Sequence, residues 1–127
     1  MPANERKLRV VLKANAIFSF TSGVLVSLFY GRLADFMQVG NAYVLLGIGI
    51  GLILFSATVF QAARRGALSP RQVKSIIIQD WAWVLGSVMI IGLQAWDLTN
   101  AAYWMVGVVA LIVADFAIFQ RKYLKGL

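Results

Sequence analysis

Residues 42–63 read AYVLLGIGIGLILFSATVFQAA, a stretch with no charged side chain. A helix needs about 20 consecutive apolar residues to cross the hydrocarbon core of a bilayer. Inside that core every backbone N–H and C=O must find its partner within the protein, which favours an α-helix. The stretch therefore predicts a transmembrane helix.

Three further stretches of the same kind flank this one, at residues 10–30, 75–95 and 101–120. What remains of the chain is two short tails and three short connections, which leave no room for a soluble domain. We therefore expect an all-α, integral membrane four-helix bundle that occupies residues 1–127 as a single domain.

The composition supports this class and excludes several functions. Apolar residues make up 61% of the chain and charged residues only 13%, against roughly 25% charged residues in a soluble domain. The absence of Cys and His excludes disulfides, thiol nucleophiles, His or Cys metal sites and imidazole catalysis. We expect no metal and no cofactor.

The net charge of +7 does not indicate nucleic-acid binding, because the basic residues flank apolar spans and form no soluble basic face. Of the twelve Lys and Arg residues, only Arg32 lies on one side of the predicted spans. The positive-inside rule then places both termini in the cytoplasm. The basic start of the chain resembles a signal peptide, but its apolar run is too long and lacks a cleavage site, so it predicts an uncleaved first span.

The connections carry helix-capping signals. Asn41 can cap the second helix and Thr99 or Asn100 the fourth. Residues 69–72 (SPRQ) fit a capping box with Pro70 at the first helical position. Residues 31–40 mix apolar and polar side chains at near-helical spacing, which fits either a short interfacial helix or a loop.

Two segments suggest an internal repeat. Residues 52–61 (LILFSATVFQ) and 111–120 (LIVADFAIFQ) share several identities, and basic residues follow both. A parallel two-helix repeat would match Asn15 with Asp80 and Ser56 with Asp115. Chance similarity between apolar helices is the alternative.

Several polar residues fall within the spans, where a carboxylate costs about 2.5–3.5 kcal/mol even on the lenient insertion scale. We therefore expect them to face one another inside the bundle. Functionally, they would line a polar cavity open to the cytoplasm, with Asp80 and Asp115 as proton or cation sites. Structurally, they would only join the helices by hydrogen bonds. The candidates are Asn15, Ser19, Ser22, Asp80, Trp83, Ser87 and Asp115.

Small residues at four-residue spacing mark places where helices approach closely. Gly47-x-x-x-Gly51 has this pattern, and Ala110-x-x-x-Ala114 is a weaker version. Both fit either a dimer face or packing within the bundle, and with four helices to pack, the second is favoured.

The segments Asn15-Ala16-Ile17-Phe18-Ser19, before Ser22-Gly23, and Asp80-Trp81-Ala82-Trp83-Val84-Leu85-Gly86-Ser87 resemble a family of small bacterial four-span inner-membrane proteins without assigned activity. The resemblance covers most of the chain and implies an inner-membrane location. It implies no activity.

We expect a non-catalytic subunit, assembly protein or scaffold that acts through its helix faces, within a homodimer or a larger membrane complex. The alternative is a small proton-coupled transporter or permease centred on Asp80. A membrane-embedded enzyme would have only a carboxylate pair to work with, so we expect no catalysis. No small-molecule substrate is indicated.

Overall fold

The computed structural model describes residues 2–93 and 99–125, and within these ranges the chain forms helices and no strands. The helices are α1 (Pro2–Leu28), α2 (Tyr30–Met37), α3 (Ala42–Arg64), α4 (Pro70–Leu93) and α5 (Asn100–Lys125). The all-α class is confirmed. In the described ranges the chain forms five helices rather than four, because residues 30–37 form a helix of their own.

Among the described residues, three segments are long and apolar enough to cross a membrane: Asn4–Leu28, Ala42–Arg64 and Asn100–Lys125. They match the first, second and fourth predicted spans. The third predicted span corresponds to α4, which carries Lys74, Gln79 and Asp80 in its first half. The end of that predicted span, residues 94 and 95, lies outside the described residues.

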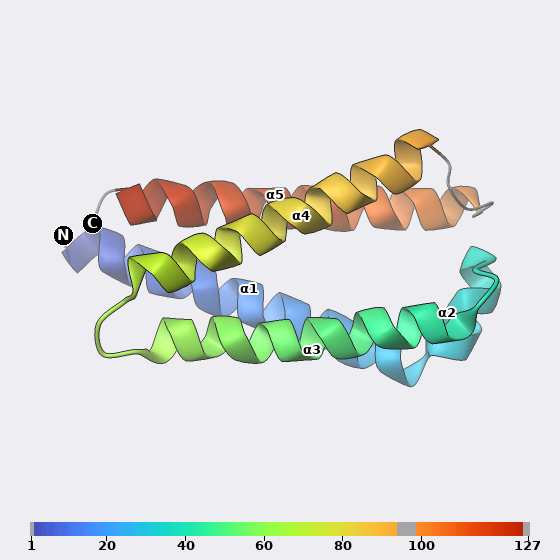
Figure 1. The fold of residues 1–127 in the computed structure, drawn as a ribbon, viewed down its shortest axis with the longest axis horizontal. Helices are drawn as coiled ribbons and strands as arrows, with labels where there is room; N and C mark the ends of the chain where they lie inside the picture. The colour runs from blue at the N-terminus through green and yellow to red at the C-terminus, as the bar shows by residue number, and fades with distance from the viewer. Residues whose placement is uncertain (1, 94–98, 126–127) are drawn as a thin grey trace.

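The four long helices run along one axis as two packed pairs (Figure 1). α1 packs against α3, α4 packs against α5, and the pairs are joined mainly between α1 and α5. Both chain ends and the α3–α4 connection lie at the same end of the molecule, whereas α2 lies at the other. We call the first of these the basic end, because eleven of the twelve Lys and Arg residues belong to the helix segments and the connection on that side.

The capping predictions hold at three helix starts. The Asn41 side chain accepts a hydrogen bond from the Tyr43 amide at 3.0 Å, and Thr99 Oγ1 accepts one from the Ala102 amide at 3.2 Å. Ser69 Oγ accepts from the Gln72 amide at 3.3 Å. The Gln72 side chain does not complete a capping box. Its Oε1 accepts from Arg65 instead, at 3.2 Å.

The short helix α2 closes the end opposite the basic end. It buries Ala34 and Met37 against Leu45 of α3 and Ala102 of α5. Thr99 also donates to α2, through its side chain to the Phe36 carbonyl and through its amide to the Met37 carbonyl, both at 3.2 Å. Of the two predicted alternatives for residues 31–40, the helix is therefore correct.

Candidate functional site

A buried polar cluster joins three helices near the basic end. It consists of Asn15 from α1, Asp80 from α4 and Gln120 from α5, and each is at most 1% exposed. Ser19, one turn beyond Asn15, is also buried. We call these four residues the polar cluster. It is the largest concentration of buried polar side chains in the described chain.

Helical spacing places these side chains among the core residues. Asn15 follows the buried Leu8 and Leu12 on one face of α1, and Asp80 follows Val73 and Ile76 on one face of α4. Steps of three and four residues keep side chains on the same side of a helix. Each polar residue therefore enters the core because the apolar residues of its own helix point there.

The hydrogen bonds of the cluster converge on the Asp80 carboxylate. Asp80 Oδ2 accepts from Gln120 Nε2 at 2.8 Å and from Asn15 Nδ2 at 3.1 Å. Asn15 Nδ2 also donates to Gln120 Oε1 at 3.0 Å, and Ser19 Oγ donates to Asn15 Oδ1 at 3.2 Å. Amide N–H groups, and no basic side chain, therefore stabilise the carboxylate. The cluster is a closed network in place of the predicted cavity open to the cytoplasm.

The structure does not bring together all of the predicted cavity residues. Ser22 and Trp83 are half-buried, and neither forms a hydrogen bond with the cluster. Ser87 is also half-buried, and its Oγ donates to the Trp83 carbonyl of its own helix at 2.8 Å. Only Asn15, Ser19 and Asp80 of the predicted set share the network.

Asp115 lies on an exposed face of α5. It is five residues from Gln120, a rotation of about 140° around the helix. Because Gln120 faces the core, Asp115 points away from it. The two carboxylates that were expected to act together are therefore not paired.

Gln120 is the cluster member that the sequence did not single out. Its position just before the basic residues Arg121 and Lys122 is typical of a side chain at the membrane interface. A signal was nevertheless present: Gln120 lies three residues after Ala117 and ten after Ala110, and both alanines are buried. The spacing of small residues marked the core-facing side of α5.

The correspondence suggested by the internal repeat is only partly visible in these positions. Asn15 and Asp80, which the repeat would match, are in direct contact. Gln61, which would match Gln120, is exposed. Ser56 is buried and donates to the Ile53 carbonyl at 2.6 Å, whereas Asp115, its counterpart, is exposed.

Packing between α1 and α3 uses different glycines from those predicted. Gly47 and Gly51 are exposed, and a Cβ atom on either would meet nothing within 4 Å. A Cβ on Gly23 would lie 2.7 Å from the Gly49 carbonyl oxygen. The close approach therefore belongs to Gly23 and Gly49, and packing within the bundle was the wrong interpretation of Gly47 and Gly51. Their role in a dimer stays a prediction.

The weaker predicted motif, Ala110-x-x-x-Ala114 on α5, lies at least partly within the bundle. Ala110 is buried and Ala114 is half-buried. A dimer face at these two residues would require side chains that are already covered within the chain.

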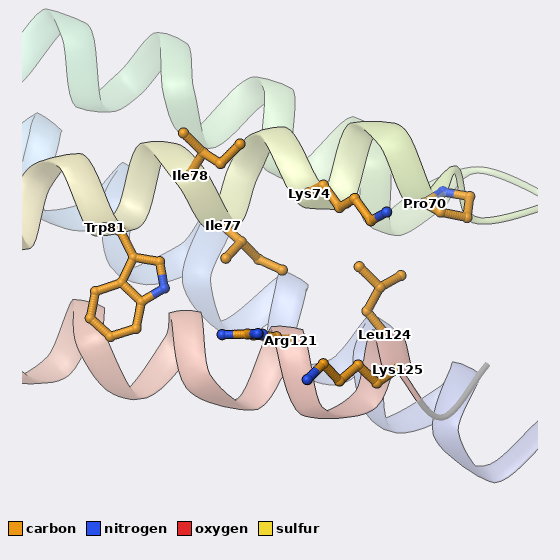
Figure 2. Close-up of a pocket in the computed structure, with 8 residues that line it drawn as sticks. All are labelled: Pro70, Lys74, Ile77, Ile78, Trp81, Arg121, Leu124 and Lys125. Atoms are coloured by element: carbon orange, nitrogen blue, oxygen red, sulfur yellow. The ribbon is translucent and has the colours of Figure 1, made fainter.

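A pocket of about 640 Å³ opens between α4 and α5 at the basic end (Figure 2). Lys74, Arg121 and Lys125 supply its basic groups, and its apolar wall is largely Ile77, Ile78, Trp81 and Leu124. We call it the α4–α5 pocket. It contains no acidic residue and was not predicted from the sequence.

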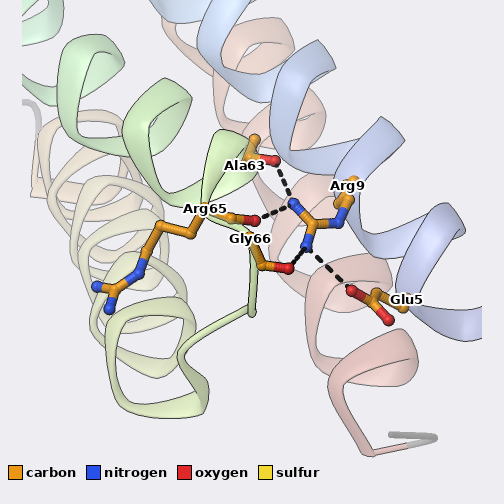
Figure 3. Close-up of polar contacts among 5 residues, drawn as sticks. All are labelled: Glu5, Arg9, Ala63, Arg65 and Gly66. Carbon is orange, nitrogen blue, oxygen red and sulfur yellow. Dashed lines mark hydrogen bonds and ion pairs between the residues drawn. The ribbon is translucent and has the colours of Figure 1, made fainter.

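Arg9 of α1 holds the carbonyl groups at the C-terminal end of α3 (Figure 3). Its Nη1 donates to the carbonyls of Ala63 at 2.8 Å and Arg65 at 2.5 Å. Its Nη2 donates to the Gly66 carbonyl at 3.0 Å and to Glu5 Oε1 at 2.9 Å. The last carbonyls of a helix have no partner within it, so Arg9 stabilises this end of α3.

Within residues 2–93 and 99–125, no group of three or more His, Cys, Asp or Glu side chains could hold a metal ion. Comparison of the chain with protein-family models, with curated proteins and with solved structures finds no match.

Proposed function

We propose that the chain is a four-span protein of the bacterial inner membrane that acts as a non-catalytic subunit, assembly protein or scaffold through its helix faces. The observation that carries this proposal is the closed polar cluster. Its one carboxylate is bound by amides from two other helices and is 1% exposed. That arrangement suits a group that holds helices together.

Membrane embedding is supported by the outer surface of the helices. Large apolar side chains are widely exposed along them, among them Ile17, Leu54, Ile78, Leu85, Val108 and Leu111. A water-soluble bundle would bury such residues. α4 has 24 residues, or about 36 Å at 1.5 Å per residue, which is long enough to make it the fourth span.

The orientation follows from the charge distribution. The start of α1, the end of α5 and the α3–α4 connection lie at the same end of the molecule (Figure 1), and all the basic residues except Arg32 lie in or beside these segments. The positive-inside rule assigns such an end to the cytoplasm. The exposed helix faces would then contact lipid, a second copy or another membrane protein.

The proposed role of Asp80 is structural. An Asp in a spanning helix is costly unless its carboxylate is compensated, and Asn15 and Gln120 supply that compensation from α1 and α5. Since α1 belongs to one helix pair and α4 and α5 to the other, the cluster links the two halves of the bundle.

Asp80→Asn tests this role against a proton-coupled transporter. An amide oxygen in place of Oδ2 can still accept from both neighbours, so we expect the folded yield and the melting temperature in detergent to change little. Any partner that copurifies with the parent chain should also be retained. Asp80→Leu provides the contrast, because it removes every acceptor and should lower the melting temperature.

A transporter or an enzyme that depends on Asp80 predicts a different outcome. In liposomes, a substrate-dependent proton flux that is present in the parent chain and lost in Asp80→Asn would overturn the scaffold proposal. Equal behaviour of the two proteins, with Asp80→Leu destabilised, would support it.

A further inference from the structure

The three basic side chains of the α4–α5 pocket have no partner within the described chain. No hydrogen bond or ion pair joins Lys74, Arg121 or Lys125 to residues 2–93 or 99–125. Two come from the last turns of α5 and one from the first turns of α4. Three cations therefore line one pocket with no acidic side chain among its described lining residues.

Other basic residues at the same end are occupied differently. Arg9 donates to backbone carbonyls and Glu5, and Arg65 donates to Gln72. Lys7 and Lys122 lie over the Tyr123 ring at 5.8 and 5.9 Å. These four basic residues therefore have contacts within the chain that the three pocket cations lack.

The rest of the pocket is apolar. Ile77 is buried, whereas Ile78 and Trp81 are 68% and 40% exposed on the outer side of α4. Figure 2 shows the Trp81 indole reaching from α4 toward α5, with Arg121 rising from α5 beside it. Tryptophan is enriched where a membrane protein meets the headgroup region, since its ring is apolar and its N–H is polar.

The order of these side chains along the helix matches the order of groups in a phospholipid. Trp81 is seven residues beyond Lys74, or about 10 Å deeper along α4. Figure 2 shows Lys74 and Lys125 on the side of Pro70 and Trp81 on the opposite side, with Arg121 between them. A bound lipid would meet the cations with its phosphate and the wall with its acyl chains.

We propose that the α4–α5 pocket binds one anionic phospholipid, with the headgroup phosphate between Lys74, Arg121 and Lys125. Basic pockets between spanning helices on the cytoplasmic side bind anionic headgroups in this manner. Free phosphate would offer the same charge to the cations, but it would leave the exposed side chains of Ile78 and Trp81 uncovered. The apolar wall favours the lipid.

The test is native mass spectrometry of the full chain in detergent, titrated with phosphatidylglycerol. We expect one lipid to be retained, and phosphatidylcholine with the same acyl chains to bind at least tenfold more weakly. In Arg121→Gln/Lys125→Gln, affinity for phosphatidylglycerol should fall roughly 10- to 30-fold, since each basic group near a membrane contributes about a factor of five.

The matched control is Arg6→Gln/Lys13→Gln, which has the same net charge and removes exposed basic residues from α1. We expect its affinity to stay within twofold of the parent chain. An equal loss of affinity in both double variants would indicate general charge attraction and would overturn the proposed lipid site. Unchanged affinity in Arg121→Gln/Lys125→Gln would also overturn it.

Two further arms complete the design. Displacement of the lipid by inorganic phosphate or glycerol 3-phosphate at equal concentration would assign the pocket to a free phosphate and overturn the proposal of a lipid ligand.

With Trp83, Trp96 and Trp104 replaced by Phe, brominated phosphatidylglycerol should quench Trp81 fluorescence more strongly than brominated phosphatidylcholine. This readout needs no charge variant, and equal quenching would contradict the proposal. It is also independent of the scaffold function, which Asp80→Asn tests.

Discussion

Gln120 donates the shortest hydrogen bond that reaches the buried carboxylate of Asp80, at 2.8 Å. The same side chain accepts from Asn15 through its oxygen. Because it serves as donor and acceptor at once, its removal leaves two buried polar groups short of a partner. Such losses cost more than the bond itself contributes, since the orphaned group cannot return to water.

Gln120→Leu should therefore destabilise the chain by about 1–3 kcal/mol. Gln61→Leu is the matched control, because Gln61 ends the equivalent FQ motif on α3 but is exposed, and we expect it to change stability by less than about 0.5 kcal/mol. Reversible unfolding in mixed micelles, followed by circular dichroism, measures both. Equal effects at the two positions would show that the cluster contributes nothing particular to stability.

At the scale of the elements, α1 and α3 fit together at the C-terminal end of α3 and at the close approach of Gly23 and Gly49. Arg9 donates to the Ala63 carbonyl in the last turn of α3 and to the Arg65 and Gly66 carbonyls just beyond it. The charge also complements the partial negative charge at a helix C-terminus. One side chain of α1 thus stabilises both the end of α3 and its position beside α1.

Arg9→Gln should lower the unfolding free energy by about 1–2 kcal/mol, since several charge-assisted hydrogen bonds at a partly exposed site are lost. Arg9→Lys should recover little, because an ammonium group does not reproduce the fork of the guanidinium. The rate of amide hydrogen exchange at residues 62–65 should increase in both Arg9 variants. Arg6→Gln changes an exposed neighbour on α1 and serves as the control. An equal increase of the rate in Arg6→Gln would argue against the capping role of Arg9.

Gly23 and Gly47 allow a test of the α1–α3 contact with a single methyl group. Gly23→Ala would place a Cβ 2.7 Å from a backbone oxygen, so overpacking should cost roughly 1–3 kcal/mol. Gly47→Ala meets nothing within 4 Å and should be neutral or stabilising by up to about 1 kcal/mol, because Ala favours helices. Thermal unfolding compares the two. A folded Gly47→Ala chain that loses a dimer would instead assign Gly47 and Gly51 to a second copy.

On the scale of the whole molecule, charge and apolarity are arranged along one axis. The basic end carries the tails and the α3–α4 connection, and α2 covers the opposite end (Figure 1). During membrane insertion, segments rich in Lys and Arg are retained on the cytoplasmic side. The proposed orientation in the bilayer therefore depends on the basic residues at this end.

Cysteine labelling in intact cells tests that orientation directly, since the chain has no native Cys. Gly40→Cys and Gly66→Cys place a thiol at opposite ends, and a Cβ at either position meets nothing within 4 Å. We expect a membrane-impermeant maleimide to label Gly40→Cys in whole cells and Gly66→Cys only after lysis. The reverse pattern would invert the proposed topology.

The sequence by itself determined the all-α class, the three described helices that are long and apolar enough to cross a membrane, and the caps at Asn41, Ser69 and Thr99. These features depend on the hydropathy and the local hydrogen bonding of one segment at a time. It also marked Asn15 and Asp80 as polar residues that should meet, and their side chains do.

Only the tertiary structure decided which side of each helix faces inward. It showed that Gln120, Asp80 and Gly49 are buried, whereas their counterparts Gln61, Asp115 and Gly47 are exposed. The two members of each pair look equivalent in sequence. The physical reason is that lipid is as apolar as a protein core, so hydropathy does not distinguish the two environments. The rotation of each helix about its axis is set by packing against its neighbours, and that rotation selects the residues of the polar cluster.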